Sequence, residues 1–130
     1  MGNLAGVLSL YMSEYESMQS FCNLVHSYHF LPLFKGDMRE IEWRVRFFDE
    51  NLSRILPLVY NHFKALDLSS EIFLIKWFMT LFSNLFPINM LARVWDNFLL
   101  EGEIYMFKCS IAYLKYFQLE LKVQVYLYLR

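Results

Sequence analysis

Residues 71–102 have the sequence EIFLIKWFMTLFSNLFPINMLARVWDNFLLEG, and this stretch decides the fold. From Glu71 to Phe86, apolar side chains occupy nearly every direction around a helical axis, which predicts a helix at the centre of the protein. Pro87 suits the first turn of a second helix, which is expected to run through Leu100 and to stop at Gly102. The stretch therefore predicts two consecutive helices joined at a proline.

Each of these two helices carries a tryptophan block. The first contains Trp77-Phe78 followed by Leu81-Phe82, and the second contains Trp95 between Arg93 and Asp96. Burial preferences favour a core in which both tryptophans share one apolar interior, over a ligand site. Arg93 and Asp96 are three residues apart, so their side chains can pair on one helix face where the helices meet.

The chain before this stretch also predicts helices. Apolar residues dominate positions 4–12, which suits a buried helix. Ser13 and Glu16 have the spacing of a capping box, and they predict a second helix over residues 14–29 that is stopped by Pro32. Its apolar residues, at three-to-four spacing, are Tyr15, Met18, Cys22, Val25 and His29, with Phe21 and Leu24 alongside.

Gly36-Asp37 marks a turn, after which Asp37 can cap a further helix with Glu40 completing a capping box. This helix has the clearest amphipathic pattern in the chain. Pro57 is expected to kink it or to start a new helix that continues to residue 66. The apolar face of the amphipathic helix that begins after Asp37 carries Ile41, Val45, Phe48, Leu52, Ile55 and Leu56.

The remaining segments also predict helices, so the expected fold class is all-α. Asp67, Ser69 and Ser70 are expected to form a loop and cap before residue 71, and another helix is expected over residues 103–117. Residues 119–130 alternate aliphatic and polar side chains, which is a strand pattern without a partner strand in the chain. We expect this tail to be a helix continuation or a poorly ordered end.

Composition limits the class of protein. A length of 130 residues corresponds to one domain or part of one, and 57% hydrophobic residues exclude a disordered chain. A net charge of -1 excludes an overall basic nucleic-acid binder. Cys22 and Cys109 are too few for a disulfide scaffold or a cysteine zinc site, and we expect buried thiols in a reducing, cytoplasmic compartment.

The apolar excess raises the question of a membrane span. Residues 77–92 carry no charge, but they are fewer than the ~20 residues that a bilayer requires. Residues 17–34 are also uncharged, but polar side chains and Pro32 interrupt them. Neither stretch makes a good transmembrane helix, and we expect at most peripheral contact with a membrane.

Candidate chemistry is sparse. Cys22, His26 and His29 would share one helix face, but no fourth ligand lies at a matching spacing, which favours packed or surface polar residues over a metal site. Asp49 and Glu50 are adjacent and would point in different directions, as on a solvated face. The sequence contains no nucleophile elbow, phosphate loop or dinucleotide fingerprint. We therefore expect no catalytic residue, cofactor or metal.

The two tryptophan blocks carry a family resemblance. The segments Ile75 to Phe82, Phe86-Pro87 and Arg93 to Gly102 together resemble the C-terminal half of the TBC domain of Rab GTPase-activating proteins. Residues 1–6 resemble the stretch after the family's Tyr-x-Gln-Gly motif. Residues 56–63 and 107–114 resemble two further helices of the family, in the same order.

The resemblance implies an all-α, multi-helix C-terminal lobe of a TBC domain over residues 1–118, with residues 119–130 as a C-terminal tail. The matching positions are implied to be mainly structural, and no partner-binding residue is assigned. These positions are Trp77, Phe78, Leu81, Phe82, Pro87, Arg93, Trp95, Asp96 and Gly102.

The resemblance also implies what this chain does not supply. Members of the family are similar in placing an Arg, from Ile-x-x-Asp-x-x-Arg, and a Gln, from Tyr-x-Gln, at the nucleotide of a Rab-type GTPase. The chain begins just past where that Gln would stand, and none of its arginines lies in the Arg motif. An arginine finger contributes ~10³–10⁵ in rate, so we expect no stimulation of GTP hydrolysis by this chain alone.

Two functions remain open at this point. The chain is either a fragment of a Rab GTPase-activating domain acting in vesicle trafficking, or a non-catalytic helical module that binds a small GTPase or a scaffold partner. The resemblance implies a cytoplasmic localisation, at most peripheral to endomembranes. A half domain exposes apolar side chains, so we expect a missing N-terminal lobe or self-association to cover them.

Overall fold

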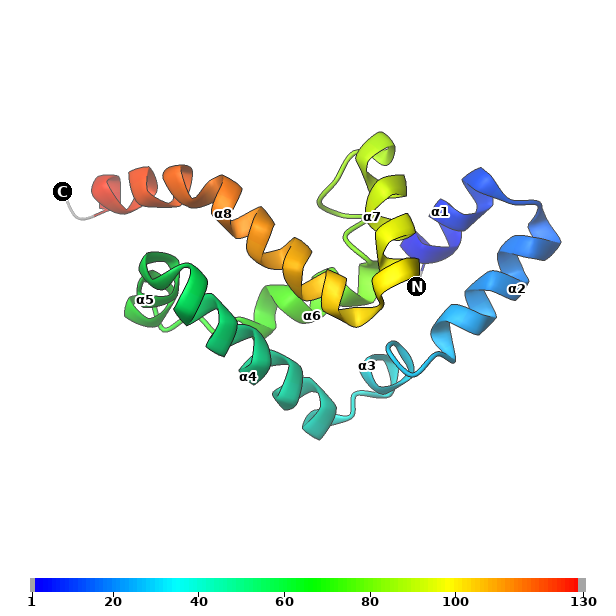
Figure 1. Cartoon of the computed structure of the whole chain (residues 1–130), viewed down its shortest axis with the longest axis horizontal. Helices are drawn as coiled ribbons and strands as arrows, with labels where there is room; N and C mark the ends of the chain where they lie inside the picture. Colours follow the sequence, from blue (N-terminus) through cyan, green and yellow to red (C-terminus); the bar gives the residue numbers. More distant parts are fainter. Residues whose placement is uncertain (1, 129–130) are drawn as a thin grey trace.

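The computed structural model describes residues 2–128, with side chains described from residue 2 to residue 118. Within these residues the chain forms eight α-helices and no strand, which confirms the all-α class. A hairpin of α1 and α2 lies at one end of the molecule, and α8 passes over α6 and α5 towards the other end (Figure 1). The helices are α1 (Gly2–Tyr11), α2 (Glu14–Val25), α3 (Leu31–Lys35), α4 (Met38–Ile55), α5 (Pro57–Ala65), α6 (Glu71–Thr80), α7 (Ile88–Glu101) and α8 (Glu103–Tyr128).

Local sequence signals set several helix ends as expected. At the start of α2, Ser13 and Glu16 form the capping box, and the hydrogen bonds from Ser13 lower the pKa of the Glu16 carboxyl. Pro57 starts α5 as a new helix. Gly36 and Gly102 end α3 and α7 with φ of 68° and 70°, a region that favours glycine because it has no Cβ.

One apolar core connects the helices. It is built mainly from α4, α6, α7 and α8, with contributions from α1, α3 and α5. Phe48 of α4, Phe78 of α6 and Phe82 just after α6 have no exposed surface. Fully burying such a side chain contributes roughly 1.5–3 kcal/mol each, so this cluster is the main source of stability that holds the motif helices in place.

The end and orientation of α2 differ from the prediction. The helix ends at Val25 because polar side chains take its last carbonyls: Nδ1 of His26 lies 2.9 Å from the Cys22 oxygen, and the Ser27 hydroxyl donates to Leu24 at 2.6 Å. Only part of the predicted apolar stripe faces the core: Tyr15 is 78% and Met18 64% exposed, whereas Phe21 and Leu24 are partly buried against the core. The side that packs on α1 has Ser17 at its centre.

Three smaller features were also mispredicted. Pro32 does not stop α2, which has already ended at Val25; it lies in the first turn of the short helix α3. Glu40 does not complete a capping box with Asp37, because its carboxylate binds the Arg44 guanidinium instead. Ile55, expected on the buried face of α4, is 53% exposed at the end of that helix.

The C-terminal segment continues α8. The helix passes the expected end near residue 117 and reaches Tyr128, while the side chains of the tail from residue 119 onward lie outside those described. Along the part of the chain that the structure covers, no helix is both long enough and apolar enough to cross a bilayer.

Candidate functional site

The motif residues of α6 and α7 meet in one interior. Trp77 and Trp95 are both 8% exposed and belong to the same core cluster, together with the fully buried Phe78 and Phe82. The ring centroids of Trp77 and Phe73 lie 4.7 Å apart. The Phe78 ring packs edge-on against the Phe107 ring of α8. The tryptophan blocks therefore fix how α6, α7 and α8 are held together.

The helical pattern of the sequence predicted a helix to Phe86 and did not predict the turn that follows α6. Leu81 and Phe82 adopt left-handed φ values of 45° and 61°, and Phe82 N–H donates to the Trp77 oxygen at 2.9 Å. This is the hydrogen bonding of a glycine-ended helix, made here without glycine. The Trp95 indole N–H donates to the Leu81 oxygen at 3.0 Å and holds the turn in its strained conformation.

The polar members of the motif point outward, and the expected pairing of Arg93 with Asp96 is wrong. Both side chains are exposed on α7, and no ion pair joins them in the described residues. Instead, the Arg93 carbonyl accepts a hydrogen bond from Asn97 at 2.7 Å. Pro87 is exposed as well. Solvent competes for an exposed pair, so nothing forces these two charges together.

The buried ion pair of the protein lies elsewhere, between Arg44 of α4 and Glu103 at the start of α8. Arg44 is completely buried, and its guanidinium Nε and Nη2 donate to the Glu103 carboxylate. Its Nη1 donates to the Glu40 carboxylate at 2.8 Å and to the Glu40 carbonyl at 3.0 Å. With its guanidinium taken up by these groups, Arg44 is not available to reach a partner.

His29 and Gly102 lie beside this ion pair. Nδ1 of His29 lies 3.6 Å from the second oxygen of Glu103 and has no hydrogen-bond partner among the described residues. A side chain at position 102 would meet the His29 ring at 3.5 Å, and the backbone there has φ 70° and ψ -152°. Gly102 is therefore required by its backbone conformation and also leaves room for the imidazole.

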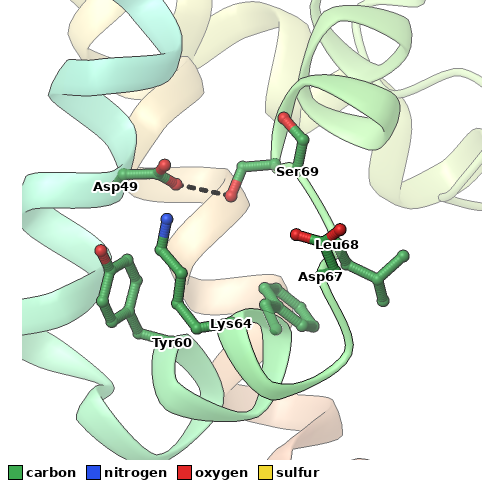
Figure 2. A pocket seen from close by; sticks show the side chains of 8 residues that line it. Asp49, Tyr60, Lys64, Asp67, Leu68 and Ser69 are labelled. Atoms are coloured by element: carbon green, nitrogen blue, oxygen red, sulfur yellow. Dashed lines mark hydrogen bonds between the residues drawn. The ribbon is translucent and has the colours of Figure 1, made fainter.

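A small pocket lies between α4, α5 and the loop before α6 (Figure 2). The Asp49 carboxylate accepts a hydrogen bond from the Ser70 hydroxyl at 2.5 Å, so Asp49 is not the fully solvated residue that was expected. The Lys64 ammonium sits 5.5 Å from the centre of the Tyr60 ring. The pocket has a volume of about 160 Å³, which is smaller than the ~300–1,000 Å³ of typical ligand sites. Its hydrogen bond between Asp49 and Ser70 joins α4 to the start of α6.

The cysteines and histidines of the described residues do not gather into one site. Cys22 and His26 lie in and just after α2, but His29 is in the turn beyond it, so the three do not share the helix face that was expected. Along the described part of the chain, no three His, Cys, Asp or Glu side chains gather as metal ligands would. Cys22 is exposed, contrary to expectation, whereas burial raises the pKa of the Cys109 thiol to about 11.

Comparisons with known proteins agree on one family. The family described as Rab-GTPase-TBC domain matches residues 1–122. Drainin of Dictyostelium discoideum is 32% identical over 114 residues, which are 88% of this chain and 26% of that protein. TBC1 domain family member 12 of Mus musculus is 32% identical over 122 residues, 91% of this chain and 17% of that protein.

A third relative supports the same family. TBC1 domain family member 14 of Homo sapiens is 30% identical over 118 residues, 91% of this chain and 17% of that protein. This chain thus spans about a fifth of the length of the curated relatives that it matches. No solved structure matches the chain significantly.

Proposed function

This chain belongs to the Rab-GTPase-TBC domain family, and from that premise we propose that it is the C-terminal, helix-packing half of a domain that, in full-length form, stimulates GTP hydrolysis by a Rab-type small GTPase in vesicle trafficking. The observation that carries the proposal is the family match over residues 1–122. The two tryptophan blocks support it, because Trp77 and Trp95 share one interior as the resemblance implies. We place this function in the cytoplasm, at most peripheral to endomembranes.

The same proposal holds that the 130 residues do not accelerate GTP hydrolysis alone. The sequence contains neither Ile-x-x-Asp-x-x-Arg nor Tyr-x-Gln-Gly. Arg44 is bound to Glu103 and Glu40 inside the protein, so it does not offer a substitute finger. Without a group that stabilises the transferring phosphoryl, the ~10³–10⁵-fold acceleration typical of an arginine finger is absent.

The test is a single-turnover GTP-hydrolysis assay against a panel of purified Rab GTPases. This chain is compared with an upstream-extended form that carries both motifs. We expect the intrinsic rate with the chain alone and an acceleration of about 10³-fold or more with the extended form and its cognate Rab. An Arg→Ala change in the extended form's finger motif is the matched control. Acceleration by the 130 residues alone would contradict the proposal.

A second function is favoured by the exposed apolar side chains on the outer end of α7. Leu99 is 71% exposed and Leu100 84% exposed, which is unusual for adjacent leucines on a helix that is otherwise well packed. Under this alternative the chain is a non-catalytic module that holds a small GTPase or a scaffold partner. Biosensor binding to GTP-loaded Rab, without hydrolysis in either form of the protein, would support it.

A further inference from the structure

The turn between α6 and α7 contacts the beginning of the chain. In this turn Asn84 is exposed, and its side-chain oxygen accepts a hydrogen bond from the amide nitrogen of the Asn3 side chain at 2.5 Å. Asn3 lies in the first turn of α1, 81 positions earlier in the sequence. From this end, which lies beside the α6–α7 turn, α1 runs outward to the tip of the α1–α2 hairpin (Figure 1). The contact therefore ties the start of α1 to the helices that carry the tryptophan blocks.

The α6–α7 turn is itself held in place on both sides of Asn84. Before it, the Trp95 indole N–H donates to the Leu81 oxygen at 3.0 Å. After it, the Leu85 N–H donates to the Phe82 oxygen at 2.9 Å, and the Phe82 side chain has no exposed surface. A turn that is bonded to a neighbouring helix and rooted in the core can serve as an anchor for the segment that it contacts.

The rest of α1 is held by apolar contacts on one face. Leu4 has no exposed surface, and Val7 and Leu8 are also buried in the core cluster. Hydrophobic burial is non-directional, whereas a hydrogen bond has a preferred geometry. The bond between Asn3 and Asn84 therefore adds a directional restraint at the point where the chain enters α1.

We propose that Asn84 is a positioning residue for the Gln that members of the family place at the nucleotide of a Rab-type GTPase. Residues 1–6 resemble the stretch directly after the family's Tyr-x-Gln-Gly motif, so this Gln stands just before residue 1 in a form that carries the motif. An anchor on Asn3 limits how far that Gln can move, and Trp95 acts through the same turn. The inference rests on the proposed function, and it gives Asn84 no contact with the nucleotide.

The effect of losing this anchor falls on the maximal rate of GTP hydrolysis. A catalytic group that is misplaced by about 1 Å can cost ~10²-fold in rate. One exposed hydrogen bond is a weaker restraint, because its typical net contribution corresponds to a two- to tenfold change in a population, roughly. A finger that acts in the transition state contributes little to ground-state binding, so the concentration that gives the half-maximal rate stays the same.

Amide hydrogen exchange of the 130-residue chain, followed by NMR, tests the anchor without a GTPase. In an α-helix the amides of residues 6 and 7 bond to the carbonyls of residues 2 and 3, so they report on the first turn of α1. We expect these amides to exchange about three- to tenfold faster in Asn84→Ala. Asn61→Ala changes an exposed asparagine of α5 and is the matched control, which is expected to leave their exchange unchanged.

Conservative variants separate the hydrogen bond from a general effect of mutation. Asn84→Asp keeps an oxygen that accepts from the Asn3 amide. Asn3→Asp is also compatible with the bond, because the Asn84 amide can turn and donate its N–H. Asn3→Asp/Asn84→Asp places two carboxylates opposite each other. We expect both single variants to behave like the parent chain and the double variant to lose the restraint.

Single-turnover GTP hydrolysis with the upstream-extended form, at increasing concentrations of that form, tests the positioning role. We expect Asn84→Ala and the double aspartate variant to lower the maximal rate about three- to tenfold, at an unchanged half-maximal concentration. Asn84→Asp and Asn61→Ala are expected to keep both values. All of these sites are exposed, so the variants are expected to keep the helical circular dichroism of the parent.

The possible failures can be told apart. If the extended parent accelerates hydrolysis but Asn84→Ala keeps its maximal rate, the positioning role is overturned and the proposed function stands. The same holds if the half-maximal concentration rises instead, if the double aspartate variant behaves like the parent, or if Asn84→Ala leaves the exchange of α1 unchanged. An extended parent that does not accelerate hydrolysis of any Rab would overturn the proposed function, and this inference with it.

Discussion

Separating the buried ion pair of Arg44 and Glu103 is expected to destabilise the protein strongly. The two residues lie 59 positions apart in the chain and join α4 to the first turn of α8. Arg44 is completely buried and Glu103 is 9% exposed, so neither charge can return to water without moving the helices. Breaking a buried pair by removing one partner costs about 3–5 kcal/mol, because the other charge stays buried and unpaired.

The double replacement should behave differently. Arg44→Met and Glu103→Leu are each expected to lose about 3–5 kcal/mol of unfolding free energy. Arg44→Met/Glu103→Leu is expected to lie within about 2 kcal/mol of the parent chain, because no uncompensated charge remains at the α4–α8 contact. The half-exposed Glu40 carboxylate can turn to solvent in the double variant. The coupling energy between the two sites is then about 4 kcal/mol or more.

Urea unfolding, followed by tryptophan fluorescence and by circular dichroism, measures these differences. A single loss of about 3–5 kcal/mol is a large part of the ~5–15 kcal/mol typical of a domain, so the single variants are measured at low temperature, where they stay folded. Lys108→Met breaks the surface pair with Glu101 and is the matched control, with an expected loss of about 0–1 kcal/mol. A loss below about 1 kcal/mol for Arg44→Met, or a double variant as unstable as the sum of the single variants, would refute the reasoning.

Four further outcomes can be checked on this chain and its variants. Trp95→Phe keeps a six-membered aromatic ring but removes the rest of the indole, including the N–H that binds the Leu81 oxygen, and we expect a loss of about 1–3 kcal/mol in thermal unfolding. No loss would mean that the turn keeps its conformation without this hydrogen bond. Gly102→Ala is expected to lose a similar amount, about 1–3 kcal/mol, because φ 70° with ψ -152° is strained for any side chain. Maleimide at pH 8 is expected to modify Cys22 but not Cys109 until urea is added, and mass spectrometry of the products checks this. Because burial raises the pKa of Cys109 to about 11, the unfolded thiol ionises first as the pH rises above about 8.5, so stability should fall between that pH and 11, and Cys109→Ala should remove the fall.

Sequence signals that act over a few residues predicted much of the fold. The Ser13 capping box, Pro57 at the start of α5 and Gly102 at the end of α7 all lie where the sequence placed them. Each of these signals works through bonds or dihedral angles of its own helix turn, so no distant residue can alter it. The burial of Trp77 and Trp95 also followed from residue type, because large aromatic side chains on apolar helices have few alternatives to the core.

Features that depend on contacts with distant residues could not be predicted from the sequence. Leu81 gives no local indication that α6 ends before it, because leucine favours helix; the Trp95 indole stabilises that end from another helix. Arg44 was missed as a buried residue because arginine is rarely buried, and its partner Glu103 is 59 positions away. Arg93 and Asp96 were expected to pair because their spacing allows it, but spacing does not exclude water.

The amino-acid sequence by itself determined the all-α class, the helix ends set by a capping box, Pro57 and Gly102, and the burial of Trp77 and Trp95. The tertiary structure decided which face of α2 is buried and which charges are removed from water. The physical reason is one of range. Hydrogen bonding and backbone strain within a helix turn involve residues three or four apart, whereas burial of Arg44, or exposure of Tyr15, depends on which helices arrive from elsewhere in the chain.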